Sequence, residues 1–472
     1  MLFSSITFLF AFLPVVLLVY FISPVKLRNF ILVFFSLLFY AWGEPRYVLI
    51  MLLALIIGYI FGIVIEYYIQ RNMKKRAQIF TIVSITLNLG LLVYFKYAGF
   101  FVNNLNMIPG INIEPIKLTL PLGISFYTFQ ILSYTIDVYR KTARAKKNPI
   151  DLAAYITFFP QLIAGPIVRY ETIEKELCDR RENVDDFAEG ARRVIAGLGK
   201  KVLIANTAGA LFDQLKALGA GENTVLLSWL CSIAFSIQIY FDFSGYSDMA
   251  IGMGRMFGFH FPENFNYPYI SRSITEFWRR WHISLSTWFR DYVYIPLGGN
   301  QRGRVRTVFN MLVVWLLTGF WHGAAWNFII WGFYYFVLLS IEKNVSGKVL
   351  DRLPDFVRRL YTLFFVNIGW VIFAYDNTTE LTGALKNMFG FGNIPLTSYN
   401  TGFYLLSYGM FICIAVFAST PVPKYIGKNI TDRIKNESVR GIVEALILSL
   451  IFIMSVAFLA GNAYNPFIYS RF

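Results

Sequence analysis

Long apolar stretches separated by short basic loops are the feature that most constrains the fold of this chain. The N-terminal part contains candidate membrane spans over residues 1–22, 29–43, 47–65, 78–95 and 119–138. Three more follow near the C-terminus, at about 360–375, 402–419 and 441–460. Because a hydrocarbon core about 30 Å thick takes about 20 apolar residues per helix, this pattern predicts a helical protein that crosses a membrane many times.

The composition agrees with lipid as the surrounding solvent. Hydrophobic residues make up 56% of the chain and charged residues only 15%, whereas soluble domains carry about 25% charged residues. This excludes disordered, fibrous and secreted disulfide-rich classes. Three widely spaced cysteines, Cys178, Cys231 and Cys413, support neither a disulfide framework nor a zinc site.

The charge distribution predicts the orientation in the membrane. Lys and Arg number 43 against 28 Asp and Glu, which in a soluble protein would suggest nucleic acid. Here the basic residues gather in loops, at 26–28, 71–76 and 140–147, and all three loops fall on one side if the spans alternate. The positive-inside rule then places these loops inside, and we expect a multi-pass protein of the cell (plasma or inner) membrane. Its N-terminus lies outside, its first span is uncleaved, and no nucleic acid is expected as a partner.

The middle of the chain, residues 148–345, does not divide into clean spans. Its apolar runs are interrupted by Pro160 and by Gly245, Gly252 and Gly254, with charges close by. Because non-helical backbone at membrane depth must be shielded by protein or line a wet cavity, we expect the functional site here.

We therefore expect one membrane domain, 1–472, in three parts. N-terminal spans cover 1–147, a core with broken helices covers 148–345, and C-terminal spans cover 346–472. A polar stretch within the core, about 169–194, is interpreted as a loop with an amphipathic helix.

Only three histidines occur, and His322 stands in the most unusual position. The nearly uncharged run from Thr307 to Ile341 would be about 52 Å long as one helix, so it must break or turn. His322 lies at the middle, between Gly319 and Gly323, and this glycine pair also predicts close approach of another helix. The alternative is a tight turn with His322 at the membrane surface. We favour a functional role, because ionisable residues inside a membrane are usually functional.

His282 lies in a segment predicted to be an amphipathic helix. Ser273 and Glu276 match a capping box that would start the helix. One stripe is apolar, and a second carries polar side chains, including Arg279, His282, Ser286 and Arg290. Such a helix either faces a wet cavity or lies at the membrane surface with snorkelling arginines, and the periodicity leaves both open. His260 is assigned to a loop, without a role.

Asp242 and Asp248 end a long apolar run, where a lone carboxylate would be costly. Asp242 could orient an imidazole or pair with a structural arginine, and we favour the structural pairing. The sequence contains no P-loop, HExxH or GxSxG motif. This weakens nucleotide hydrolase, metalloprotease and serine hydrolase hypotheses.

Several motifs together resemble a known family. The most specific are Phe277–Ser286 (FWRRWHISLS) and Gly319–Gly323 (GFWHG), accompanied by Pro121–Gln130 (PLGISFYTFQ) and Phe159–Ile167 (FPQLIAGPI). In this order and spacing they resemble the membrane-bound O-acyltransferases. The bacterial alginate O-acetylation branch is the most similar, with peptidoglycan O-acetylation and D-alanyl-teichoic acid transfer proteins as relatives.

The resemblance implies a fold and an activity. Family members are all-α polytopic membrane proteins, with a ring of transmembrane helices around a thin centre formed by re-entrant or broken helices. They move an acyl group from a thioester to a hydroxyl. In this branch an acetyl group is expected to cross the membrane and reach an extracytoplasmic acetyltransferase partner that modifies a surface polysaccharide. The family's catalytic histidine matches His322, and its upstream polar position matches His282.

From this resemblance we expect His322 to act as general base on the acceptor hydroxyl. His282 would orient the acceptor, stabilise the oxyanion or position the thioester. Arg279, Ser286, Asp242 and Asn327 are expected to contact the donor or line a tunnel. No tightly bound cofactor and no metal are expected, only an acyl thioester co-substrate, acetyl-CoA or an acyl carrier protein.

Two other functions fit the same sequence. A transporter or flippase would also have broken spans and wet central charges, although no inverted repeat is visible. A scaffold inside an acetylation complex would need the protein but not its histidines. The sequence does not identify the acceptor.

Overall fold

The computed structural model describes residues 1–116, 118–163, 165–219, 221–461 and 464–465. Ala164, in the predicted motif Phe159–Ile167, lies outside the described residues. Secondary structure in the described ranges is helical throughout, and nine of these helices or helical runs are long and apolar enough to cross a membrane. The prediction of an all-α polytopic membrane protein is confirmed. The ring around a thin centre stays a prediction.

The chain forms two compact units, each built from two segments. The first unit comprises Met1–Val194 and Tyr246–Pro262. Its helices are α1 (Leu13–Ile22), α2 (Arg28–Gly43), α3 (Val48–Gln70), α4 (Lys74–Leu105), α5 (Ile124–Arg140), α6 (Pro149–Thr157), α7 (Phe159–Leu162), α8 (Tyr170–Cys178) and most of α9 (Val184–Gly199).

The second unit comprises Ile195–Gly245 and Glu263–Phe472. Its helices are α10 (Asn206–Lys216), most of α11 (Val225–Met256), α12 (Ile274–Arg280), α13 (Ile283–Phe289), α14 (Gly303–His322), α15 (Trp326–Ile341), α16 (Gly347–Leu350), α17 (Asp355–Ala374), α18 (Thr378–Met388), α19 (Tyr399–Ala418), α20 (Val422–Arg433) and α21 (Glu437–Gly461). These boundaries differ from the three-part division expected from the sequence, which stays a prediction.

Most of the predicted outer spans are present. The candidate spans Val25–Gly43, Pro45–Gln70 and Lys74–Leu105 match the second to fourth predictions, and α17, α19 and α21 match the last three. The first predicted span is shorter than expected, because the apolar helical run covers only Phe8–Ile22.

Helix α5 corresponds to the predicted span 119–138, yet it is not among the nine candidate spans. Nearly all its side chains are buried, including Thr128, Gln130 and Asp137. A side chain at Gly62 of α3 would overlap the ring of Tyr134, so α3 lies close against α5. The helix was predicted correctly, but its polar side chains show that it packs against protein rather than lipid.

Two predictions about the middle of the chain are wrong. The first is wrong in its extent: the expected amphipathic helix is α8, and a loop follows it. From Val184, however, the stretch belongs to α9, which begins a candidate span Val184–Lys216 that contains a π-helical segment, Lys200–Ala205. The expected breaks at Gly245, Gly252 and Gly254 do not occur, since α11 runs through all three. Within their own units, Gly245 and Gly252 instead let the backbone of α9 approach closely.

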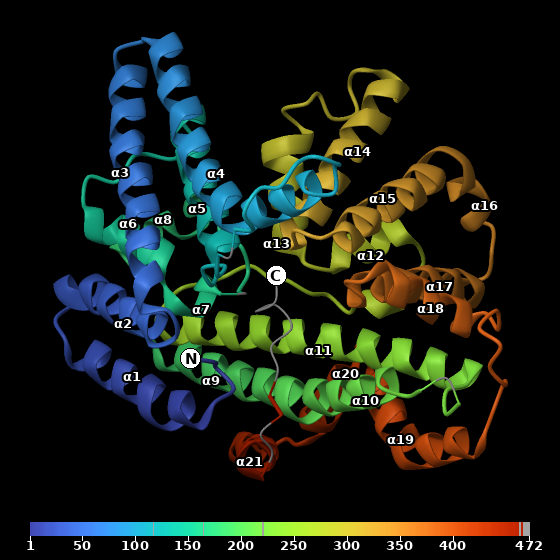
Figure 1. Cartoon of the computed structure of the whole chain (residues 1–472). Coiled ribbons are helices and arrows are strands. Elements are labelled where there is room, and N and C mark those ends of the chain that lie inside the picture. The colour runs from blue at the N-terminus through green and yellow to red at the C-terminus, as the bar shows by residue number, and fades with distance from the viewer. Residues whose placement is uncertain (117, 164, 220, 462–463, 466–472) are drawn as a thin grey trace. The chain divides into compact units, whose positions relative to one another are not determined.

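The predicted break in the apolar run 307–341 is confirmed. Helix α14 ends at His322, three residues follow, and α15 starts at Trp326. The two helices pack along each other as a hairpin (Figure 1, yellow to orange). A Cβ atom at Gly319 would clash with the carbonyl of Phe328, so the predicted close approach of another helix at this glycine is also confirmed.

Candidate functional site

His322 is the last residue of α14 and is buried, with 4% of its surface exposed. The next residue, Gly323, is extended, and its amide donates to the Gly319 carbonyl at 3.4 Å. The imidazole is held edge to face by Trp331, at 5.1 Å between centroids, and by Phe373, at 5.3 Å. The tight turn of the alternative is present, since three residues join α14 and α15, but the ring itself is enclosed by protein.

His282 lies at a break rather than within a helix, so the prediction of one continuous helix is wrong. Helix α12 ends at Arg280 and α13 starts at Ile283, while His282 takes a left-handed conformation with φ 45°. The Ile283 amide donates to the Asn264 carbonyl at 3.0 Å. In a continuous helix the Ile283 amide would donate to a carbonyl four residues earlier. Here it donates to a residue of another segment instead.

Asn264 also fixes the imidazole of His282. Its side-chain oxygen accepts from the amide and the hydroxyl of Ser284, at 3.3 and 2.9 Å, and lies 3.1 Å from His282 Nδ1. The Ser284 amide can only donate, so the Asn264 atom that it contacts is the side-chain oxygen, which can only accept. Nδ1 of His282 must therefore carry the proton of the neutral ring. Nε2 therefore holds the lone pair. It is buried and has no hydrogen-bond partner among the described residues.

The two histidines line one cavity of about 540 Å³. Arg279 and Ser286 line it as well, together with Arg290, Trp315 and Thr318. Four of the six predicted site residues are therefore brought together. The arrangement offers two imidazoles, hydroxyl groups and a cation around a space large enough for a small substrate.

A second chamber of about 500 Å³ adjoins this cavity, because Thr275, Arg279 and Leu339 line both. It also contains Lys343 and Arg358. Arg279 is exposed and forms no ion pair with a described residue. Arg279 thus lines both chambers, one with further cationic side chains and the other with the two histidines.

Other charges around the cavity are paired. Arg290 contacts Asp291 at 2.6 Å, which raises the pKa of the guanidinium. Burial alone would raise the pKa of Glu276, but hydrogen bonds from the Arg272 amide and the Arg280 guanidinium hold it below its usual value. The guanidinium of Arg290, already paired with a carboxylate, is therefore less suited than that of Arg279 to bind an anion.

The start of α12 is anchored by Glu342, which the sequence analysis did not single out. Its carboxylate accepts from the amides of Ile274 and Thr275, at 2.7 and 2.9 Å. An anion at a helix N-terminus satisfies otherwise unpaired amide groups. The predicted Ser273 cap is confirmed, since its side chain accepts from the Glu276 amide.

Asp242 and Asn327, also predicted for the site, do not line this cavity. Asp242 pairs with Lys201 at 2.7 Å, with both side chains at 2% exposure. The favoured structural pairing is thus present, but with a lysine in place of the arginine. Asn327 donates to the Phe373 carbonyl at 3.3 Å and lies 3.4 Å from Asp376, so it ties α15 to the end of α17.

His260, to which no role was assigned, lies in the first unit and is half exposed. Its Nδ1 lies 2.9 Å from Glu176, and its Nε2 lies 3.5 Å from Asp186. In the same unit, Asp248 pairs with Arg193 at 2.9 Å. These contacts join charged surface residues and hold no imidazole inside a cavity.

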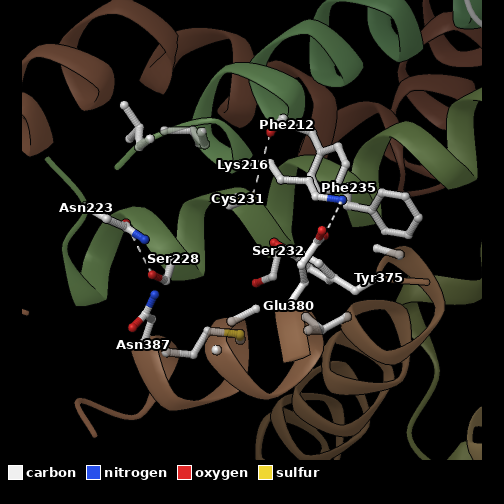
Figure 2. A pocket seen from close by; sticks show the side chains of 17 residues that line it. Phe212, Lys216, Asn223, Ser228, Cys231, Ser232, Phe235, Tyr375, Glu380 and Asn387 are labelled. Atoms are coloured by element: carbon white, nitrogen blue, oxygen red, sulfur yellow. Dashed lines mark hydrogen bonds and ion pairs between the residues drawn. The ribbon is translucent and has the colours of Figure 1, made fainter. Parts of the chain in front are cut away.

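A further cavity of about 320 Å³ lies between α10, α11, α17 and α18. Figure 2 shows Lys216, Glu380 and Tyr375 around it, together with Ser228 and Ser232. Neither histidine is among the described residues that line it. The described residues also contain no group of three His, Cys, Asp or Glu side chains suited to hold a metal ion. The cavity with two imidazoles remains the best candidate site.

Comparison with known proteins agrees with this choice of region. Residues 138–379 match the model of the family described as MBOAT, membrane-bound O-acyltransferase family. The matched range includes both histidines of the cavity.

Individual relatives extend the similarity over the whole chain. The probable alginate O-acetylase AlgI of Pseudomonas putida is 40% identical, over all of both chains. The peptidoglycan O-acetyltransferase of Helicobacter pylori is 37% identical, over 84% of this chain and 81% of its own. The teichoic acid D-alanyltransferase of Bacillus subtilis is 33% identical, over 54% of this chain and 68% of its own.

Proposed function

Because the chain belongs to the membrane-bound O-acyltransferase family, we propose that this enzyme transfers an acetyl group from a thioester to a hydroxyl for O-acetylation of a cell-surface polysaccharide. The names of the relatives from Pseudomonas and Helicobacter support acetyl as the group and a polysaccharide as the final acceptor. The observation that carries the proposal is the cavity lined by His322 and His282.

In the proposed reaction His322 is the general base. As the acceptor oxygen attacks the thioester carbonyl, its proton passes to the imidazole, a step typically worth 10²–10⁴-fold in rate. The C–S bond then breaks, and the imidazolium returns the proton to the leaving thiolate. A neutral imidazole suits this enclosed position, because burial disfavours the charged form.

The geometry of His282 narrows the three roles considered for it. With the proton on Nδ1, the neutral ring presents a lone pair at Nε2 and no N–H to an oxyanion there. The reacting hydroxyl has a single proton, which His322 takes, so we assign His282 to orient the acceptor by accepting a hydrogen bond from another of its donor groups.

The donor is proposed to reach the histidines through the adjoining chambers. A thioester of CoA or of a carrier protein bears phosphate, which Arg279 can bind. Placing the basic loops inside predicts a donor that arrives from the cytoplasm, with the enzyme in the inner membrane and its N-terminus outside. The acetyl group then leaves on the other side, where an extracytoplasmic acetyltransferase partner delivers it to the polysaccharide.

The test compares three histidine variants in cells with equal protein levels. We expect His322→Ala to abolish surface-glycan acetylation and His282→Ala to reduce it strongly. His260→Ala, a matched control outside the cavity, should retain normal acetylation. Unchanged acetylation in His322→Ala would refute the base role and favour a scaffold.

A second assay separates catalysis from transport. Purified protein is incubated with labelled acetyl thioester and an acceptor alcohol, and free thiol is measured. Release of thiol that depends on His322 supports the enzyme. Movement of intact thioester across a vesicle membrane without thiol release would instead support a transporter.

A further inference from the structure

A fourth cavity, of about 540 Å³, lies between α11, α17 and α19 of the second unit. Ile233 and Ile237 line it from α11, Leu363 and Val366 from α17, and Val416 from α19. It shares no described lining residue with the histidine cavity. Its walls are mainly aliphatic and aromatic, so a water molecule inside would find few polar partners.

The loose packing of α19 creates this cavity. Only Thr401 and Ala415 are buried in this helix, and 11% of its apolar window is enclosed by protein. Its N-terminal end is held near the start of α11, where the hydroxyls of Thr401 and Thr224 lie 3.0 Å apart. Along its length, Val416 faces the cavity and is still 51% exposed. The cavity therefore opens to the surroundings of the helices, which in a membrane are lipid chains.

One end of the cavity carries a cation. Arg359 lines it near the start of α17 and is exposed. Its neighbour Arg358 pairs with Asp351 at 3.0 Å, whereas the guanidinium of Arg359 forms no hydrogen bond or ion pair with another described residue. From Arg359 to Val366 the helix rises about 10 Å, so the apolar walls extend directly from the cation toward the middle of the helix.

We propose that this cavity binds one anionic phospholipid, with an acyl chain between α11, α17 and α19 and the phosphate on Arg359. An empty apolar space would forfeit dispersion contacts on all its walls, and a lipid chain restores them. An arginine at the mouth binds phosphate through two N–H groups. The lipid completes the packing of α19 against the rest of its unit.

The test uses native mass spectrometry of the full-length protein, purified in mild detergent from equimolar phosphatidylglycerol and phosphatidylethanolamine. We expect the wild type to retain one phospholipid, with phosphatidylglycerol preferred about fivefold. Arg359→Gln should lose this preference. Arg352→Gln, a change at an exposed arginine that does not line the cavity, should keep it.

A second pair of variants tests the acyl chain. Val416→Trp fills the cavity and should abolish the retained lipid, whereas Leu406→Trp, at an 88% exposed position on the same helix, should retain it. The proposal is overturned if the wild type retains no lipid, if its lipid matches the bulk mixture, or if the two tryptophan variants behave alike. It is also overturned if a second copy of the chain, rather than a lipid, is lost in Val416→Trp.

Discussion

The side-chain oxygen of Asn264 lies 3.1 Å from Nδ1 of His282 and so determines which nitrogen of the ring can act on a substrate. Ser284 donates to the same oxygen from its amide and its hydroxyl, which fixes the orientation of the amide group. The neutral ring of His282 therefore carries its proton on Nδ1, and Nε2 keeps the lone pair. Asn264 precedes the histidine by 18 residues in the same unit, and through this contact it acts as a positioning residue for the imidazole.

Replacing Asn264 by Leu should lower turnover about 10²-fold, because the imidazole can then adopt the other tautomer or rotate. Asn264→Asp keeps an acceptor oxygen and should retain much of the activity. The carboxylate of this variant also favours the charged imidazole of His282. The pH at which activity rises should therefore be higher than in the wild type. Thiol release by the purified variants measures both effects.

Asn266→Leu serves as the control for this substitution. Asn266 is in the same segment, but it makes its hydrogen bonds to Arg280 through backbone atoms, with its amide donating to the Arg280 carbonyl at 2.9 Å. Its activity should stay near that of the wild type. Equal losses in Asn264→Leu and Asn266→Leu would show that the segment matters only for folding.

Gly319 provides a second prediction, since it allows α14 and α15 to meet beneath His322. Gly319→Ala should destabilise the protein by about 1–3 kcal/mol through overpacking against the Phe328 carbonyl. Gly383→Ala in α18 meets no atom within 4 Å and should be neutral or slightly stabilising. Thermal unfolding in detergent distinguishes them, and a stable, fully active Gly319→Ala protein would contradict the close packing.

The breaks at His322 and at His282 differ in how far the sequence could predict them. The α14–α15 break follows from local information, because an apolar run too long for one span contains Gly319, His322 and Gly323. The break at His282 does not, because it depends on Asn264 from another segment. The local pattern there is that of a good helix, and a tertiary contact overrides it.

The distribution of charge led to a wrong prediction for a similar reason. Lys200 and Lys201 obscured the candidate span Val184–Lys216, since a lysine in an apolar run usually argues against a span. Asp242, the partner of Lys201, lies 41 residues further along the chain. The sequence could therefore show that Asp242 needed a partner, but not which residue it was. The gathering of His282 and His322 was likewise inferred from resemblance rather than from spacing.

Glu182 gives the first unit a predictable response to acid. Burial would raise the pKa of this carboxyl, but hydrogen bonding from Tyr20 and the charges of Arg28 and Arg180 lower it below the usual 4.5. A lowered pKa in the folded state stabilises the fold above pH 4.5, and this stabilisation is lost as the pH falls through the folded-state pKa. The unfolding temperature should therefore drop below about pH 4.5.

Glu182→Gln removes this titration, so its unfolding temperature should be lower at pH 7 and change less on acidification. Glu189→Gln is the control, because its side chain is half exposed and its contacts with Arg192 and Arg255 are 3.6 and 3.7 Å long. Identical pH profiles for wild type and Glu182→Gln would disprove the assignment.

The buried pair of Lys201 and Asp242 yields the last prediction. Lys201→Met leaves a carboxylate buried at 1% exposure and should destabilise the protein by about 3–5 kcal/mol. Asp242→Leu should do the same, since the buried Lys201 loses the carboxylate at 2.7 Å and the hydrogen bond to Asn206 Oδ1 at 2.9 Å does not neutralise its charge. The double variant should recover most of the loss, because two apolar side chains can replace a buried ion pair without leaving a charge behind. Thermal unfolding of the wild type and the three variants forms a double-mutant cycle, and strictly additive losses would mean that the two charges do not stabilise each other.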